Sequence, residues 1–138
     1  MIEGCIITIA RFKGRRGTVM SDPAKKKFRL KAHEIKPLAT GRGGCIASDM
    51  ITVDGRRVAF MYRQEPDNDV DSGWRFMSGF ESREYMDDAS NHAAYDVNTI
   101  ANYDPDIIPF LDAPIGSAFE RPGGKGKFVE VHDFDPPD

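Results

Sequence analysis

The sequence predicts one small α+β domain, built mainly from an antiparallel sheet with a few short helices. Its length of 138 residues lies in the range of about 100–150 that is commonest for compact domains. Short runs rich in β-branched and aromatic residues are separated by clusters of Gly, Pro and Asp, a pattern typical of strands joined by turns. Ser and Asp residues stand where short helices would begin.

Residues 1–42 predict a basic, β-rich N-terminal extension packed on the core. Residues 2–10 favour a strand because they are rich in Ile and Thr. Phe28 and Leu30 alternate with Lys and Arg, and this period of two favours a half-buried basic strand. Pro37 and the glycine-rich stretch at 41–44 indicate a flexible joint, so a second segment is expected over residues 43–121.

A β-hairpin is predicted at the pair Asp54-Gly55, between residues 45–53 and 56–63. An Asp-Gly pair between β-rich runs favours a type I′ turn, because both central residues need positive φ. A two-residue loop would place Ile51 opposite Val58 on a mostly apolar face.

The rest of the second segment alternates short strands with short helices. Strands are expected over residues 74–78, 95–97 and 116–119. Ser78 and Glu81 fit a capping box, which predicts a helix over residues 81–87. Asp104-Pro105 fits the start of another helix, which Pro109 would limit. The glycines after Pro122 end the compact part, leaving residues 122–138 as a tail.

Charge is distributed unevenly along the chain. The net charge is −3, but residues 1–63 carry +9 and residues 64–138 carry −12. Such a split indicates either two faces that attract each other or two different partner surfaces.

The composition favours a cytoplasmic protein. No run approaches the roughly 18 apolar residues that a membrane span needs, and residues 5–10 are too short for a signal-peptide core. Cys5 and Cys45 lie far apart without a CxxC spacing, which favours two reduced, partly buried thiols.

No motif in the sequence predicts a metal, a cofactor or a catalytic centre. The acidic loop at 67–73 resembles the start of a calcium loop, but Ser72 replaces the required Gly and Ser78 the required Glu. His33, His92 and His132 lack a metal-ligand spacing, and no nucleophile elbow or phosphate-binding loop is present. We therefore expect no cofactor and no metal.

Two polar groups could be structural or functional. Arg75, beside the single tryptophan, could pair with the acidic loop or with Glu81 and Glu84. A second polar cluster surrounds a turn, and Asx side chains commonly cap and shape such loops, so a structural role is expected, with a binding site as the alternative. Its members are Asp96, Asn98, Thr99, Asn102 and Asp104.

A series of motifs in residues 43–121 carries a family resemblance. The most distinctive is Asp96-Val97-Asn98-Thr99-Ile100-Ala101-Asn102-Tyr103-Asp104-Pro105. Other stretches are Gly44-Cys45-Ile46-Ala47-Ser48, Asp71-Ser72-Gly73-Trp74-Arg75-Phe76 and Glu84-Tyr85-Met86-Asp87-Asp88. Together they resemble the bacterial immunity protein 33 domain family. Where that family carries an acidic residue after Ser78-Gly79, this chain has Phe80.

The resemblance implies binding rather than catalysis. An immunity protein neutralises a cognate protein toxin by occupying or locking it, which needs an exposed complementary patch. The acidic half of the chain would suit a basic toxin such as a nuclease. We therefore expect an exposed partner surface. Charge reversal at Asp69 and Asp71 should weaken partner binding without lowering the melting temperature. The members of this surface are Asp67, Asp69, Asp71, Trp74, Glu81, Glu84 and Tyr85.

Two other functions remain open from the sequence. The basic segment at 11–31, with Phe12 and Phe28 among its charges, could bind single-stranded nucleic acid, although the negative net charge disfavours this. A small hydrolase using Asp96, Asp104 and a histidine is the other alternative. Membrane binding is not expected, and the sequence does not give the oligomeric state.

Overall fold

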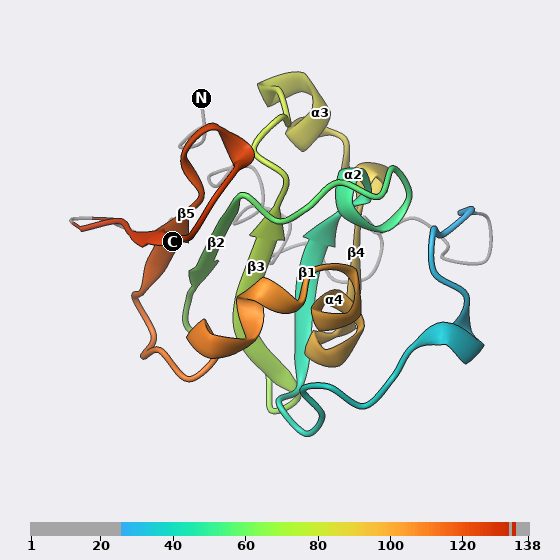
Figure 1. Ribbon diagram of the computed structural model, residues 1–138, viewed down its shortest axis with the longest axis horizontal. Helices are drawn as coiled ribbons and strands as arrows, with labels where there is room; N and C mark the ends of the chain where they lie inside the picture. The colour runs from blue at the N-terminus through green and yellow to red at the C-terminus, as the bar shows by residue number, and fades with distance from the viewer. Residues whose placement is uncertain (1–25, 133, 135–138) are drawn as a thin grey trace.

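The computed structural model describes residues 26–132 and residue 134. These residues form a six-stranded sheet with the strand order β4-β1-β3-β2-β5-β6 (Figure 1). The strands are β1 (Gly44–Ser48), β2 (Phe60–Arg63), β3 (Asp71–Met77), β4 (His92–Asp96), β5 (Ala118–Glu120) and β6 (Val129–Glu130). The described α-helices are α2 (Asp49–Thr52), α3 (Arg83–Asp87) and α4 (Val97–Tyr103). The described 3-10 helices are η2 (Ala32–Glu34), η3 (Ala89–Asn91), η4 (Pro105–Phe110) and η5 (Pro122–Gly124).

The sheet is mixed because the neighbouring strands β1 and β3 are parallel. The pairs β1–β4, β2–β3, β2–β5 and β5–β6 are antiparallel. The predicted α+β class, with a mainly antiparallel sheet and short helices, is therefore confirmed. The strands expected over 74–78 and 116–119 correspond to β3 and β5.

β3 contains an irregular step near its start. The register between β1 and β3 shifts there, and Gly73 has a φ of +92°. A Cβ atom on Gly73 would lie 2.1 Å from the backbone oxygen of Gln64, so only glycine fits this position. After the step, Trp74 and Arg75 point to opposite faces of the sheet, because side chains alternate along a strand.

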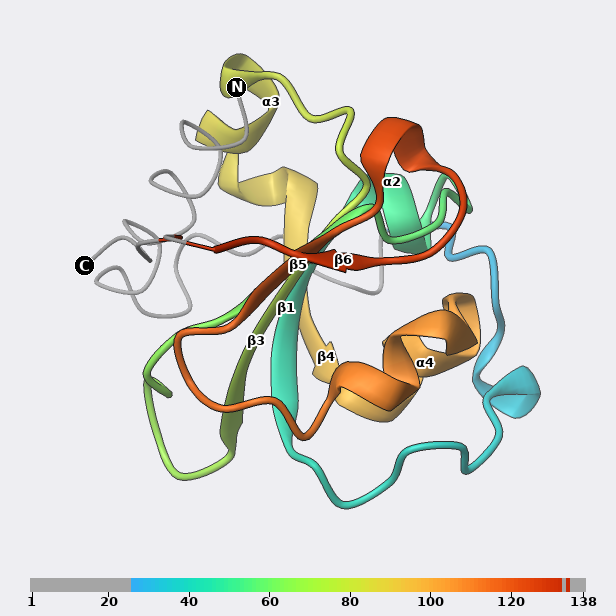
Figure 2. The same cartoon turned by 60° about the vertical axis from the view of Figure 1, so that its left-hand side comes forward.

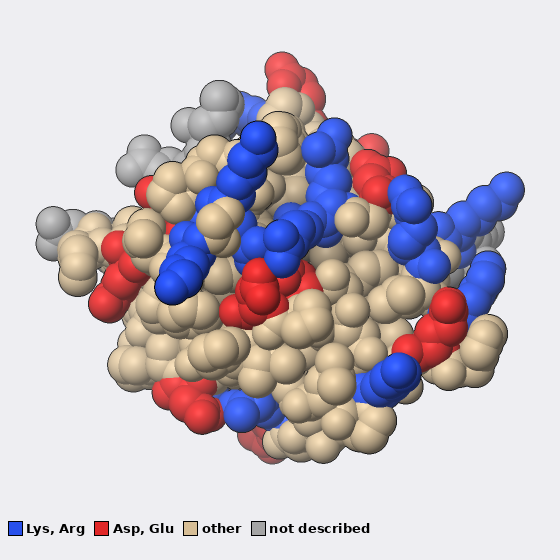
Figure 3. Space-filling view, in the orientation of Figure 1, with Lys and Arg blue, Asp and Glu red and all other residues tan. Residues whose placement is uncertain are grey.

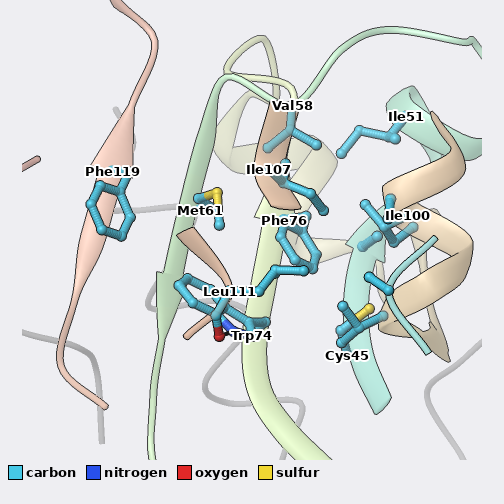
Figure 4. Close-up of a cluster of buried hydrophobic side chains, with 14 of the residues drawn as sticks. Cys45, Ile51, Val58, Met61, Trp74, Phe76, Ile100, Ile107, Leu111 and Phe119 are labelled. Atoms are coloured by element: carbon cyan, nitrogen blue, oxygen red, sulfur yellow. Dashed lines mark hydrogen bonds between the residues drawn. The ribbon is translucent and has the colours of Figure 1, made fainter. Parts of the chain in front are cut away.

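The main core lies between one face of the sheet and the helices α4 and η4, which Figure 2 shows together on one side. Figure 4 shows how the buried side chains from both layers meet. Burial of each large side chain contributes about 1.5–3 kcal/mol. The strands supply Cys45, Ala47, Met61, Trp74, Phe76 and Phe119, and the helices supply Val97, Ile100, Ala101, Ile107 and Leu111.

The core thiol agrees with the expectation for a structural cysteine. Cys45 is buried and free, and burial raises its pKa far above the usual value. A thiol that stays protonated is a poor nucleophile, so this position contributes packing rather than chemistry. Cys5 lies outside the described residues.

The hairpin predicted at Asp54-Gly55 is wrong. Residues 49–52 form the helix α2 instead of continuing the strand, and β3 lies between β1 and β2 in the sheet. Gly55 does adopt positive φ, at +79°, but it ends a helix: its N–H donates to the oxygen of Ile51 at 3.1 Å. Glycine in this conformation is as suitable for a helix C-terminus as for a hairpin, so the local signal was ambiguous.

The Glu81 half of the capping box predicted at Ser78 forms, while the Ser78 hydroxyl accepts the Phe80 N–H at 3.1 Å, and this turn does not begin a helix. Glu81 accepts hydrogen bonds from the Ser78 N–H and hydroxyl and from the Gly79 N–H, all at 2.8–2.9 Å. These bonds close a tight turn after β3. The helix α3 begins later, with Ser82 as its N-cap. The helix start predicted at Asp104 is confirmed, because Asp104 caps η4 by accepting the Asp106 N–H.

The polar cluster around α4 is structural. Asp96 caps α4 by accepting the Asn98 N–H at 2.8 Å. The Asn98 side chain accepts the N–H groups of Leu38 and Ala39, both at 2.8 Å, and donates to the oxygen of Lys36 at 2.9 Å. Asn98 therefore fixes residues 36–39, named here the N-terminal strap, along the helix.

The strand predicted around Phe28 and Leu30 is not formed, since residues 27–31 have no regular secondary structure. Their side chains still pack on the domain. The ring of Phe28 meets the ring of Tyr95 edge-on at 5.9 Å, and the Leu30 N–H donates to the Tyr103 hydroxyl at 3.0 Å. The strand expected at residues 2–10 lies outside the described residues.

The region expected to be a tail from residue 122 is partly structured. It contains η5 and β6, which pairs with β5, and Phe128 is buried. Within residues 26–132, no helix is long and apolar enough to cross a lipid bilayer.

The second face of the sheet buries a histidine, and this predicts a pH dependence of stability. Burial lowers the pKa of His92 to about 4, against 6.5 for an unperturbed histidine. Between these values the unfolded chain binds a proton that the folded chain does not, so the free energy of unfolding should fall by about 3 kcal/mol as pH drops from 6.5 to 4. Urea unfolding from pH 7 to pH 4 measures this slope.

A His92→Gln variant separates the contribution of His92 to the pH dependence of stability from the contributions of other titratable groups. Burial raises the pKa of Asp49, which shifts stability in the opposite direction at low pH. The variant should show a flatter pH profile than the wild-type chain. An NMR titration of the wild-type ring with a midpoint near 6.5 would contradict the prediction.

Candidate partner-binding site

The loop between β2 and β3 is acidic and exposed, and it lies at the end of the sheet opposite α3 (Figure 1). Glu65, Asp67 and Asp69 are all exposed. Val70 at the tip is 73% exposed. The loop therefore presents carboxylates beside an apolar side chain.

A buried arginine anchors this loop from inside the domain. Arg75 is 1% exposed and contacts both carboxylate oxygens of Asp71, at 2.9 and 3.0 Å. It also reaches Asp67 at 3.4 Å. Of the two pairings that the sequence left open for Arg75, the structure therefore forms the one with the acidic loop.

Asp71 completes the anchor by binding backbone groups. Its two carboxylate oxygens accept the N–H groups of Asp67 and Gly73 at 2.8 and 2.9 Å. Burial acts to raise the pKa of Asp71, but the hydrogen bonds and charge of Arg75 outweigh it, and the pKa lies below its usual value. Asp71 is therefore an ionised support for the loop, and its charge is already neutralised by Arg75.

A second loop, residues 112–117, lies beside the base of the acidic loop. Arg63 joins them: its side chain donates to the oxygens of Ser72 and Ala113 at 2.9 and 2.8 Å. This second loop adds Asp112, which is paired with Arg42, and Ile115, which is 45% exposed. We name the exposed acidic and aliphatic residues of these loops the acidic end: Glu65, Asp67, Asp69, Val70, Asp112 and Ile115.

Two residues of the predicted partner surface are buried. Trp74 is 1% exposed; it stacks on Phe76 and its ring N–H donates to the oxygen of Leu111 at 3.2 Å. Glu81 is 4% exposed and closes the turn after β3. In this conformation neither side chain is on a surface that a partner can contact.

The exposed residues of the predicted surface fall into two groups. Asp67 and Asp69 lie before β3, whereas Glu84, exposed, and Tyr85, half-buried, lie on α3 after it. β3 has seven residues, so the groups are separated by about 20 Å along the sheet. The structure therefore does not bring the seven residues together as one patch, and their role in partner binding stays a prediction.

The acidic end includes residues that the sequence did not single out. Val70 follows the acidic run, and Ile115 lies in a Pro- and Gly-containing turn, so both have apolar side chains in segments with turn composition. An apolar side chain in a segment of turn composition was the one signal in the sequence that could have pointed to these two residues. Their exposure could be known only from the fold, because many single apolar residues in loops fold back onto the core.

The other candidate sites are resolved differently. Asp96 and Asp104 cap helices at opposite ends of α4, so the structure does not join them into a carboxylate pair. Most of the basic segment at 11–31 lies outside the described residues, and nucleic-acid binding by it stays untested.

The fold defines a small α+β domain, and its acidic end lies on two exposed loops. A family model described as the Immunity protein Imm33 domain matches residues 45–132, more than half of the chain. The chain belongs to this family. The resemblance predicted over residues 43–121 is thus confirmed, and the match extends through β6. No curated protein and no solved structure matches the chain.

Proposed function

We propose that the chain binds and neutralises a cognate bacterial toxin without catalysis, and that the acidic end contacts a basic surface of that toxin. Membership of an immunity-protein family supports toxin neutralisation. The observation that favours the acidic end is the exposed tip, Asp69 and Val70, on a loop fixed by the buried Arg75. The cytoplasmic location expected from the sequence stays a prediction.

The geometry favours binding at this tip for two physical reasons. A loop that is already ordered loses little conformational entropy when a partner binds. An apolar side chain surrounded by carboxylates can be desolvated by the partner while the surrounding charges steer the encounter. Asp67 and Asp71 would then position the loop, and Asp69 would contact the toxin.

The toxin must first be identified. Affinity purification of the tagged chain from its host, followed by mass spectrometry, is expected to recover a toxin-like protein at near-equal stoichiometry. Production of that toxin in a test bacterium should stop growth, and co-production of the full chain should restore it. A bound protein without toxicity would contradict the proposal.

Charge reversal at the tip gives the sharper prediction. Asp69→Lys should weaken toxin binding about tenfold, mainly through slower association, and the loss should shrink at high salt. The melting temperature should not change, since the Asp69 side chain is exposed. Surface plasmon resonance at two salt concentrations measures both rates.

Two matched variants decide which end of the sheet binds. Glu84→Lys reverses the exposed carboxylate on α3, and Glu130→Lys reverses one on β6. Both should bind the toxin like the wild-type chain. If Glu84→Lys weakens binding and Asp69→Lys does not, the interface lies at α3 and the acidic end is excluded.

The ion pair between Arg75 and Asp71 changes the expectation that charge reversal at Asp71 leaves the melting temperature unchanged. Asp71→Lys would place a second cation beside a buried arginine, so it should lower the melting temperature as well as toxin affinity. It is therefore not a clean test of the interface, unlike Asp69→Lys.

A further inference from the structure

We propose that a basic hollow between η4 and the segment before β6 is a second interaction surface, which takes a protein segment with a large apolar side chain flanked by carboxylates. The hollow has a volume of about 300 Å³. Pro105, Pro109, Phe110 and Phe128 form its apolar lining, and Asp106 and Lys127 contribute its charged groups. This surface is separate from the acidic end, and the inference does not depend on the toxin.

The one carboxylate of the hollow is neutralised by the domain itself. Asp106 contacts Arg57 at 2.6 Å and Arg121 at 3.4 Å. Arg121 is itself buried and paired with the buried Asp104 at 3.0 Å. These two arginines and two aspartates balance, so they leave no net charge around the hollow.

With Asp106 balanced in this way, Lys127 is the unbalanced charge among the residues that line the hollow. Lys125 and Lys127 are exposed, and neither forms an ion pair within the described part of the chain. Arg56, next to Arg57, is also exposed. Figure 3 shows basic side chains gathered around a small acidic group on this face. An apolar pocket with a cationic rim favours a partner group that is apolar at its centre and anionic around it.

The size of the hollow suits one anchoring side chain. A volume of about 300 Å³ lies at the lower limit of ligand pockets, which span about 300–1,000 Å³. Protein interfaces commonly place one aromatic or aliphatic anchor in such a pocket, inside a polar rim. The rim lysines would then contact carboxylates on the residues before and after the anchor.

The same surface is less suited to a nucleic acid. Single-stranded nucleic acids bind through free aromatic faces beside a continuous basic track. Here the guanidinium of Arg121 covers the ring of Phe128 at 4.3 Å. The half-exposed Asp106 also interrupts the basic surface. Carboxylates and a single apolar anchor therefore match the hollow better than phosphates and stacked bases.

The test is an NMR titration of the ¹⁵N-labelled full chain with blocked five-residue peptides. The probe has the sequence Asp-Asp-Phe-Asp-Asp. One comparison peptide replaces its Phe by Ala, another replaces its Asp residues by Lys, and an octamer of deoxythymidine represents nucleic acid. We expect the probe to shift the amides of Gly126, Lys127 and Phe128 most, and to bind at least about tenfold more tightly than either comparison peptide.

Variants locate the response. Lys127→Glu should weaken probe binding about fivefold or more, because it reverses the exposed charge that lines the hollow. Lys36→Glu, an exposed lysine on the N-terminal strap, should leave it unchanged. Asp69→Lys should bind the probe like the wild-type chain, so a failure of the toxin proposal would leave this inference standing.

Three results would overturn the inference. The probe could shift no amides of the hollow at millimolar concentration, or the lysine peptide could bind equally well. Tighter binding of the deoxythymidine octamer at the same amides would instead identify a nucleic-acid surface.

Discussion

Replacement of Asp104 by alanine is expected to lower the free energy of unfolding by about 3–5 kcal/mol, because it leaves the buried Arg121 without its main counter-charge. Both side chains are fully buried, and Asp104 also accepts the N–H of Val58 at 3.0 Å and caps η4. The substitution therefore removes the acceptor of three donors: the Arg121 guanidinium, the Val58 N–H and the Asp106 N–H. Urea unfolding measures the difference.

Asp106→Ala is the matched control, since the same two arginines contact this carboxylate. The Asp106 side chain is 54% exposed, so water replaces most of what it loses, and we expect a change of less than about 1 kcal/mol. The double variant Asp104→Leu with Arg121→Met should recover part of the loss, since it removes both buried charges. Equal effects of Asp104→Ala and Asp106→Ala would contradict the prediction.

Replacement of Trp74 by alanine is the other change with a large expected effect. Removal of a buried indole leaves a cavity beside Phe76 and an unpaired oxygen on Leu111, and should cost about 3–5 kcal/mol of stability. Toxin affinity of the folded fraction should not change, because Trp74 lies in the core. Thermal unfolding combined with binding at low temperature separates the two effects.

An exposed aromatic residue provides the comparison. Phe80 is 61% exposed and contacts only the Arg56 guanidinium among the ring contacts of the described residues, so Phe80→Ala should cost less than about 1 kcal/mol. If Trp74→Ala were no more destabilising than Phe80→Ala, Trp74 would not be a core residue.

The sequence predicted the kind of fold better than its connections. Alternation and turn residues located β3 and β5, and the cap at Asp104 located η4, because these signals act within a few residues. The neighbours of a strand depend on contacts far along the chain. The Asp-Gly pair therefore suggested a hairpin, whereas β3 inserts between β1 and β2.

At the candidate site, too, the sequence predicted local features but not those that depend on long-range contacts. Residue types identified the acidic loop and one possible partner for it, the adjacent Arg75. They could not show which carboxylates Arg75 neutralises, nor that alternation along β3 turns Trp74 into the core. The direction of each side chain depends on the sheet register and on the step at Gly73, and neither is a property of the local sequence.

The N-terminal strap has a consequence for where this domain begins. The family match starts at residue 45, but residues 36–39 supply three of the hydrogen-bond partners of the Asn98 side chain, which is 7% exposed. A fragment cut at the family boundary would leave a buried amide unsatisfied on the helix that covers the core. We therefore expect the strap to fold cooperatively with the domain, although the family match begins after it. Amide protons of the strap should then exchange with solvent at rates close to those of α4.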